Sequence, residues 1–257
     1  MFDWGDGDYA PTAKTLEPAT AVTLDAVGLR PGERLIDVGC GNGNALIEAA
    51  RRGAEVAGLD PSPSLVEQAA LRLAQDGLAG DVRVGTAEAP PDGLAAGDAV
   101  VSVFAVIFAP DPPAAIDGLV SLCRPGGRLA LSSWLAGGGI AAAGRILRAA
   151  FVPADAPPPP PPPPWHEPDW IAGLLEDAGA HSVTVSEHEL VFRHDSPEAW
   201  FAEQETDHPV WLTARRLLGE DAWPGVRERT LAALHEANED PGAFAASSGY
   251  VVVSAAR

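Results

Sequence analysis

The sequence predicts an α/β fold in which a parallel sheet is covered by helices on both faces. Strand and helix patterns alternate from Arg34 to Trp134, and this alternation is typical of such a sheet. A glycine-rich turn directly follows the first strand. With 257 residues, 46% of them hydrophobic, the chain can bury a full core as one domain with insertions.

The expected elements follow one another along the chain. Helices are expected at 12–27, 44–52, 63–76 and 113–123, and strands at 34–38, 55–59, 82–84, 99–104 and 128–133. A further helix is expected at 169–178, and the remaining strand candidates are 187–194 and 250–256.

The most informative segment is LIDVGCGNG, residues 35–43. Its apolar residues predict a buried strand, and Gly39, Gly41 and Gly43 leave every other position of the turn without a side chain. A ligand can therefore approach the backbone. The first amides of the following helix attract a polar or anionic group.

The glycine spacing disfavours a dinucleotide, because Asn44 stands where that fingerprint requires its third small residue. Asp37 lies inside the strand, and we expect amides of the turn to donate to its carboxylate. Asp60 ends the second strand, where a doubly wound sheet brings it beside the turn. It can accept both hydroxyls of a ribose, although alone it would be explained as a cap of the next helix.

Four segments in this order resemble the class I S-adenosylmethionine-dependent methyltransferases: LIDVGCGNG, AGLDPSPSLVEQA, DAVVSVF and LCRPGGRLALSSW. The resemblance covers residues 28–134 and is loose elsewhere. It implies a Rossmann-like doubly wound sheet of seven strands, the last antiparallel, with a helical cap insertion. It also implies S-adenosylmethionine as the cofactor.

The resemblance carries roles to individual residues. Gly39, Cys40 and Gly41 would pack on the methionine part of the cofactor, and Asp37 would hold the turn and the amino group. Asp60, followed by Pro61, would bind the ribose. Ala87 and Glu88 would border the adenine, although Thr86 stands where the family often has aspartate. Val103 and Phe104 would line the methionine and face the acceptor. Of the N-terminal arm, Trp4 and Tyr9 are expected to contact the cofactor.

Composition limits which partners the protein can bind and indicates its cellular compartment. The formal net charge of −19 disfavours nucleic acid and anionic membrane surfaces. Cys40 and Cys123 are too few for a disulfide framework and are expected to be reduced and buried. No apolar stretch reaches membrane-spanning length, and the N-terminus lacks signal-peptide features, so we expect a cytoplasmic protein.

Two stretches interrupt the alternation. Residues 135–165 hold an apolar helical run and then eight consecutive prolines, 157–164, which predict a stiff surface spacer or, as a weaker alternative, a docking site. The second, 197–244, is largely helical and contains Trp200, Trp211 and Trp223. We therefore expect an N-terminal arm and helix at 1–30 that cover the cofactor. A methyltransferase domain at 31–257 follows, with cap insertions at about 135–165 and 197–247. We expect the aromatic residues of the cap either to pack its helices or to contact substrate. We expect the apolar run 140–152 to pair two subunits if its own chain does not bury it.

Methyl transfer needs in-line placement, a dry pocket and sometimes a base, because the cofactor supplies the electrophile. His208 is a candidate base, with Glu203 near it in sequence, and His166 is a second candidate in the cap. The alternative is that His208 is a solvent-exposed histidine in an acidic helix. No histidine or cysteine spacing indicates a metal site, so none is expected.

These features predict a methyltransferase that acts on a small-molecule acceptor enclosed by the cap. Two other classes stay open: an enzyme of the same fold that uses S-adenosylmethionine without methyl transfer, and a non-catalytic partner protein that binds the cofactor. An NAD-linked oxidoreductase is disfavoured by the glycine spacing. The sequence does not name the acceptor or its nucleophilic atom.

Overall fold

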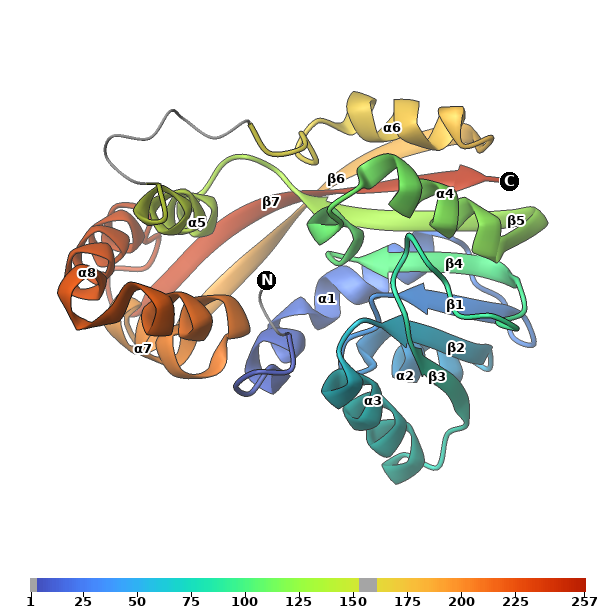
Figure 1. Ribbon diagram of the computed structural model, residues 1–257, viewed down its shortest axis with the longest axis horizontal. Coiled ribbons are helices and arrows are strands. Elements are labelled where there is room, and N and C mark those ends of the chain that lie inside the picture. Colours follow the sequence, from blue (N-terminus) through green and yellow to red (C-terminus); the bar gives the residue numbers. More distant parts are fainter. Residues whose placement is uncertain (1–3, 153–160) are drawn as a thin grey trace. The chain divides into compact units, whose positions relative to one another are not determined.

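The computed structural model describes residues 4–152 and 161–257. Its sheet has seven strands in the order β3-β2-β1-β4-β5-β7-β6 (Figure 1). β1 is paired in parallel with β2 on one side and β4 on the other, and β5 is parallel to β4 but antiparallel to β7. This is the doubly wound sheet that the sequence predicts, including the antiparallel last strand.

The bounds of the elements show how far each prediction held. The elements are α1 Ala10–Ala26, β1 Arg34–Val38, α2 Asn44–Arg51, β2 Glu55–Asp60, α3 Pro63–Gln75, β3 Gly80–Val84, β4 Gly97–Val103, η1 Val106–Phe108, α4 Pro112–Leu122, β5 Cys123–Trp134, α5 Gly139–Ala150, α6 Pro168–Asp177, β6 His181–His194, α7 Pro197–Asp207, α8 Pro209–Glu236 and β7 Phe244–Ala256. In the first half, nearly every expected boundary lies within two residues of the observed one.

Local sequence explains where several helices begin. Ser62, Asp111 and Ser196 each accept a hydrogen bond from a backbone amide of the first helical turn, and a proline follows each of them. Such residues stabilise a helix start because they satisfy an amide that has no partner inside the helix. β1 is buried because its apolar side chains lie between layers, and Leu35 and Ile36 are 0% exposed.

The described chain forms two compact units. The sheet unit consists of residues 13–134, 165–188 and 250–257. The helical unit consists of residues 4–12, 135–152, 161–164 and 189–249. The helical unit thus gathers most of both expected cap insertions and the start of the chain.

The helical unit has an aromatic core. Phe201 contacts Trp211 and Trp223 with ring centroids 5.0 and 6.3 Å apart, and Trp200 contacts Phe244 at 5.5 Å. All five side chains are buried. The three cap tryptophans therefore pack helices, which was one of the two expectations for them.

Polar contacts and packing complete this unit. The buried carboxylate of Glu205 accepts from the Trp223 indole at 2.7 Å and from Arg227 at 3.0 Å. α5 packs against α8 and buries Ala143 and Leu147, so part of the apolar run 140–152 is covered by its own chain. The dimer that this run suggested stays a prediction.

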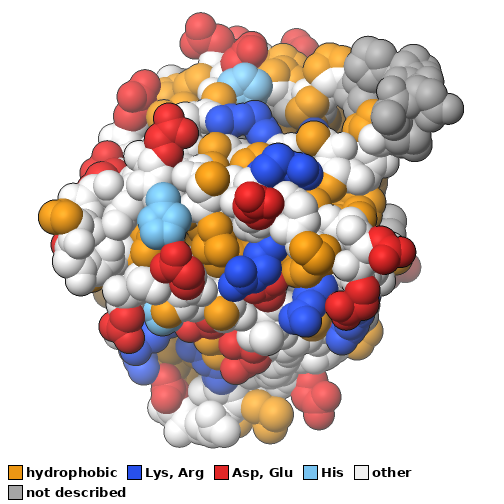
Figure 2. All heavy atoms as spheres, turned by 90° about the vertical axis from the view of Figure 1, so that its left-hand side faces the viewer, with side chains coloured by type: hydrophobic (Ala, Val, Ile, Leu, Met, Phe, Trp, Pro, Cys, Tyr) orange, Lys and Arg blue, Asp and Glu red, His pale blue; other side chains and the backbone are white. Residues whose placement is uncertain are grey.

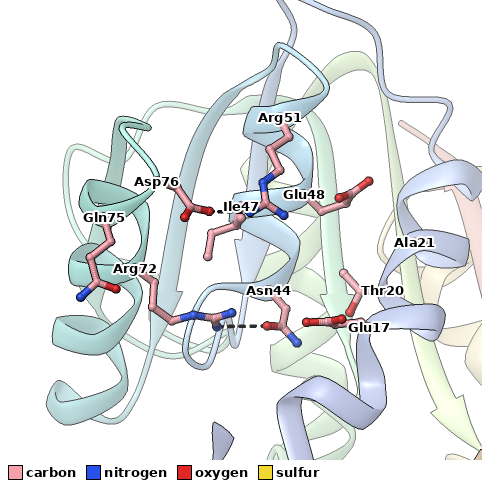
Figure 3. A pocket seen from close by; sticks show the side chains of 10 residues that line it. All are labelled: Glu17, Thr20, Ala21, Asn44, Ile47, Glu48, Arg51, Arg72, Gln75 and Asp76. Carbon is pink, nitrogen blue, oxygen red and sulfur yellow. Dashed lines mark hydrogen bonds and ion pairs between the residues drawn. The ribbon is translucent and has the colours of Figure 1, made fainter.

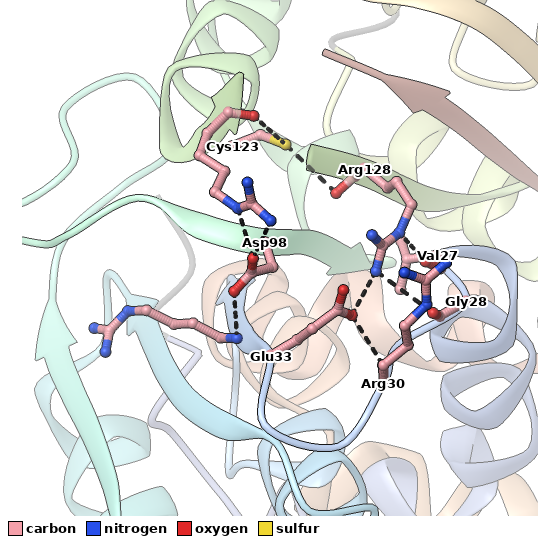
Figure 4. Close-up of polar contacts among 9 residues, drawn as sticks. Val27, Gly28, Arg30, Glu33, Asp98, Cys123 and Arg128 are labelled. Carbon is pink, nitrogen blue, oxygen red and sulfur yellow. Dashed lines mark hydrogen bonds and ion pairs between the residues drawn. The ribbon is translucent and has the colours of Figure 1, made fainter. Parts of the chain in front are cut away.

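The opposite end of the strands from the glycine turn is held by ion pairs (Figure 4). Arg128 donates to the Val27 carbonyl at 2.6 Å and pairs with Glu33 at 2.5 Å. Asp98 accepts from the Arg34 amide at 2.7 Å and pairs with Arg124 at 2.5 Å. These contacts fix the loop between α1 and β1 against β4 and β5.

The second half departs from the predicted elements. β6 begins at His181 rather than 187, and β7 begins at Phe244 rather than 250. The expected helical stretch to residue 244 is therefore wrong at its end, since helix stops at Glu236. Residues 244–249 are mostly small or polar, so their sequence does not show the alternation that is typical of a strand. Most of them are nevertheless buried in the structure.

Two further expectations concern the surface. Pro161, Pro162 and Pro163 are exposed, as expected for the proline run, and Pro157–Pro160 lie outside the described residues. Within the described part of the chain, no helix combines the length and apolar character that crossing a membrane requires.

A glycine pair tests the packing of α4. A Cβ at Gly118 would overlap the Ala87 carbonyl, whereas one at Gly144, in α5, meets nothing within 4 Å. Gly118→Ala should lower the free energy of unfolding by about 1–3 kcal/mol. Gly144→Ala should raise it by about 0.5–1 kcal/mol. Urea unfolding followed by circular dichroism measures both, and equal effects would contradict the packing.

Candidate functional site

The glycine turn has a backbone that side chains would not allow. Gly39, Gly41 and Gly43 have φ angles of 75°, 54° and 92°, in the region that favours glycine. A Cβ on Gly39 would collide with the Cβ of Ala105, which follows β4. The turn is therefore packed tightly against the end of a neighbouring strand as well as shaped for close approach.

Asp60 ties the end of β2 to this turn. Its Oδ2 accepts from the Gly41 amide at 2.9 Å, and its Oδ1 accepts from the Ser62 amide at 2.9 Å. The cap of α3 is Ser62, so the explanation of Asp60 as a helix cap is wrong. Burial raises the pKa of Asp60, while the two amides oppose that rise. Each carboxylate oxygen keeps a second lone pair for a ligand hydroxyl.

Asp37 lies deeper, and its environment differs from the expectation. Its Oδ1 is buried without a hydrogen-bond partner. The Gly39 and Cys40 amides donate instead to the Leu59 carbonyl at 2.7 and 3.0 Å, and the Gly41 amide goes to Asp60. The prediction that turn amides serve Asp37 is therefore corrected. Burial, and then the nearby Asp60 carboxylate, raise the pKa of Asp37 to about 8.

Both cysteines are free and buried, as expected. Cys40 lies in the turn, and burial raises the pKa of its thiol. A Cβ added to Gly58 would meet its Sγ at 3.1 Å, so the thiol fills the space over β2. Cys40 therefore packs as a small apolar residue rather than as a thiolate.

The end of β4 is strained and aromatic. Phe104 has a φ of 52°, which is unusual for a bulky residue and costs free energy that the surroundings must offset. Its amide donates to Ser132 Oγ at 3.0 Å. Its ring stacks on Trp134 with centroids 3.9 Å apart and meets the edge of Tyr250 at 5.4 Å. Val103 thus ends β4 and Phe104 follows it, and their contact with the methionine and the acceptor stays a prediction.

The loop expected to border adenine follows β3. Ala87 is buried beneath α4, and Thr86 accepts from the Ala89 amide at 3.2 Å. The Oε1 atom of Glu88 is buried without a partner. An acceptor without a donor here is compatible with an amino group of a ligand.

A cavity of about 370 Å³ lies behind the turn, among α1, α2 and α3 (Figure 3). Arg72 reaches from α3 and donates to the Asn42 carbonyl at 2.7 Å and to Asn44 at 3.0 Å. Asn44 in turn donates to the Ala13 carbonyl of α1 at 2.6 Å. These hydrogen bonds hold the glycine turn against α1 and α3. The side chains that line the cavity therefore support the turn.

The candidate base His208 begins α8 in the helical unit. Its Nδ1 accepts from the Val210 amide at 3.3 Å, and its ring lies against Trp4 and Tyr9, with centroids 6.2 and 6.3 Å away. Burial lowers its pKa to about 4. His208 is therefore half-buried rather than freely exposed, and this pKa disfavours the predicted proton transfer near neutral pH.

The other predicted catalytic residues are dispersed. Glu203 approaches His194 at 3.5 Å in the helical unit. His166 is exposed in the sheet unit, 3.7 Å from its neighbour Glu167. Their catalytic roles stay predictions, as does contact of Trp4 and Tyr9 with the cofactor.

Sequence reasoning missed the supporting roles of several residues. Ser102 Oγ donates to the Val38 carbonyl at 2.8 Å and accepts from the Val106 amide at 3.1 Å, which joins β4 to the start of the turn. The sequence does carry a signal for Ser102, because it is a hydroxyl residue inside an apolar strand, and in the structure it is 0% exposed. Arg72 gave no such signal, because an arginine on an amphipathic helix is usually solvated.

The raised pKa of Asp37 predicts a pH effect. The folded protein holds this proton up to about pH 8, whereas the unfolded chain releases it near the ordinary value of 3.8. The contribution to stability is complete below that value and is lost as pH rises towards 8. The free energy of unfolding should therefore fall less between pH 5 and pH 8 in Asp37→Asn than in wild type. Urea titrations measure it, with Asp92→Asn as a surface control, and parallel profiles would contradict the assignment.

The chain is similar in sequence to known proteins. Residues 35–127 match the family described as methyltransferase domain. An uncharacterised protein of Mycobacterium tuberculosis is 34% identical over 199 residues, which are 76% of this chain and 72% of the relative. A ubiquinone biosynthesis O-methyltransferase of Xanthomonas axonopodis pv. citri is 37% identical over 134 residues, 51% of this chain and 55% of that protein.

The solved structures agree in fold. The YcgJ protein of Bacillus subtilis matches with a TM-score of 0.65 and 13% identity, over 93% of this chain and 98% of that protein. The doubly wound sheet of seven strands and its antiparallel last strand are those that the resemblance implied. The chain therefore belongs to the class I S-adenosylmethionine-dependent methyltransferases, whose cofactor is S-adenosylmethionine.

Proposed function

We propose that this chain binds S-adenosylmethionine and transfers its methyl group to a small-molecule acceptor. The observation that carries the proposal is the position of Asp60, whose carboxylate meets the Gly41 amide at the carboxyl ends of adjacent parallel strands. In a doubly wound sheet, this is the place where ligands bind.

The residues offer acceptors and surfaces that fit the parts of the cofactor. Asp60, with Pro61 after it, would take the ribose hydroxyls, and the partnerless oxygens of Asp37 and Glu88 suit amino groups. The backbone of Gly39, Cys40 and Gly41 would lie along the methionine part. Ala87 would border the adenine, and Val103 and Phe104 would complete the wall.

Methyl transfer requires of the protein mainly that it position the cofactor and the acceptor. When bound, the cofactor supplies an electrophilic methyl group on a positively charged sulfur. The chain's own residues would hold the two ends, align the acceptor and exclude water. Phe104, whose neighbour Ala105 lies against Gly39 of the turn, would supply an apolar surface there and is itself packed on Tyr250.

The expected partners rest on the charge of the chain rather than on observed contacts. Figure 2 shows acidic, basic and hydrophobic side chains interspersed on one face, without a basic tract there for nucleic acid. A small-molecule acceptor, no nucleic-acid or membrane partner, and a cytoplasmic location remain our expectations. Oxygen, nitrogen and carbon acceptors are all compatible with the site.

Cofactor binding is tested with adenosylhomocysteine, the product form. Isothermal titration should show binding to the wild type, and Asp60→Ala should weaken it by at least about tenfold, since two ribose hydroxyls lose their acceptor. Asp92→Ala, at an exposed carboxylate beyond β3, serves as the control and should bind as wild type. Unchanged affinity in Asp60→Ala would remove the ribose assignment.

Methyl transfer is tested by mass spectrometry of acceptor candidates incubated with S-adenosylmethionine. A product heavier by one methylene together with adenosylhomocysteine supports transfer. Turnover at constant acceptor mass would show the alternative enzyme of the same fold. Tight cofactor binding without turnover of any candidate would favour the non-catalytic alternative.

A further inference from the structure

The cavity behind the glycine turn has an acid on one side and a base on the other (Figure 3). All of its lining residues belong to the sheet unit. Glu17 lines it from α1, and Arg72 lines it from α3. Asn44 of α2 connects these two flanking helices, because it donates to the Ala13 carbonyl of α1 and accepts from Arg72.

A ligand can enter this cavity from solvent. Its volume of about 370 Å³ lies within the range of pockets that hold small molecules. Glu17, Gln75 and Asp76 are exposed lining residues, whereas Thr20 and Ile47 are buried and form part of the inner lining. The cavity is therefore open, with charged side chains at its rim.

Two of the charged residues at the cavity have no ion-pair partner. Arg72 donates through Nη1 alone, to the Asn42 carbonyl at 2.7 Å and to Asn44 Oδ1 at 3.0 Å, and both acceptors are neutral. Among residues 4–152 and 161–257, no group accepts a hydrogen bond from Nε or Nη2 of Arg72. Over the same residues the Glu17 carboxylate forms neither a hydrogen bond nor an ion pair.

The other charged residues that line the cavity are already paired. Arg51 pairs with Asp76 at 2.7 Å, and Glu48 pairs with Arg52 at 2.9 Å. A ligand with a single charge would meet one unpaired group of its own sign. A ligand that carries both charges can instead place each of them beside an opposite one.

We propose that this cavity binds a small amino acid, with its carboxylate on Arg72 and its ammonium group on Glu17. The Nε and Nη2 atoms form an edge of the guanidinium that can hold a carboxylate by two parallel hydrogen bonds. The Glu17 carboxylate accepts from the ammonium group. Binding makes and breaks no covalent bond.

Arg72 also connects the cavity to the glycine turn, since its Nη1 holds the Asn42 carbonyl. An amino acid that fixes this guanidinium fixes the support of the turn as well. Binding of the amino acid and binding of the cofactor should therefore strengthen each other. The coupling rests on the proposed function, whereas binding of the amino acid does not.

The probes are glycine, β-alanine, 4-aminobutanoate and 5-aminopentanoate, in which the two charges lie progressively further apart. NMR titration of the wild-type protein at low ionic strength should show binding of at least one of them. The carboxylate and the amine with the same carbon chain as the best probe should each bind at least about tenfold more weakly, because each lacks one charge-assisted contact. Binding by none of the four, or equal affinity for a singly charged analogue, would overturn the proposal.

Variants assign the two ends of the ligand. Glu17→Gln should lower the affinity for the amino acid to about that of the carboxylate analogue, and Arg72→Gln to about that of the amine. Glu67→Gln, at an exposed carboxylate of α3 outside the cavity, is the matched control and should bind as wild type. An equal loss in Glu67→Gln would show an effect of net charge alone and would contradict the site.

Adenosylhomocysteine, titrated into the same samples, separates the possible failures. A saturating amino acid should raise its affinity for the wild type by about fivefold, and this gain should be absent in Glu17→Gln. If the amino acid binds but adenosylhomocysteine does not, the proposed function fails and the cavity site stands. If both bind without affecting each other, the coupling through Arg72 is wrong.

Discussion

The hydrogen bond from the Gly41 amide to Asp60 is the contact on which the site depends, because it ties the end of β2 to the turn that follows β1. It sets the turn that Gly39 shapes against Ala105, and Arg72 supports the same turn from behind. Burial of a carboxylate costs free energy unless hydrogen-bond donors satisfy it. The turn supplies such a donor to Asp60, and the same hydrogen bond stabilises the turn. The carboxylate of Asp60 thus both holds the turn and offers acceptors for a ligand.

The nearby Asp37 is also buried, but it lacks the amide donors that satisfy Asp60. It lacks a partner for Oδ1, and its pKa rises until the proton stays on at neutral pH. Two carboxyl groups in one small region thus differ because backbone donors reach only one of them. An electrostatic difference of this kind is typical of ligand sites, although ion-pair networks also produce it.

The first half of the fold could be predicted from the sequence because its strands are apolar on both faces and its helices are amphipathic. The turn, Asp60 and the end of β4 followed from the same pattern. The partners of Asp37 could not be predicted, since hydrogen bonds depend on where each amide points after folding. The convergence of Trp4 with His208 was equally hidden, because about 200 residues separate them and no periodicity links the two segments.

The division into two units has a consequence for how the protein could be altered. Among the described residues the chain passes from one unit to the other after Thr12, Trp134, Pro164, His188 and Gly249, and β6 and β7 each contribute residues to both. No single excision can remove the helical unit, because strands would be cut through their middle. A graft that exchanges the helical unit between relatives would have to carry β6 from Glu189 onward and β7 up to Gly249 with it.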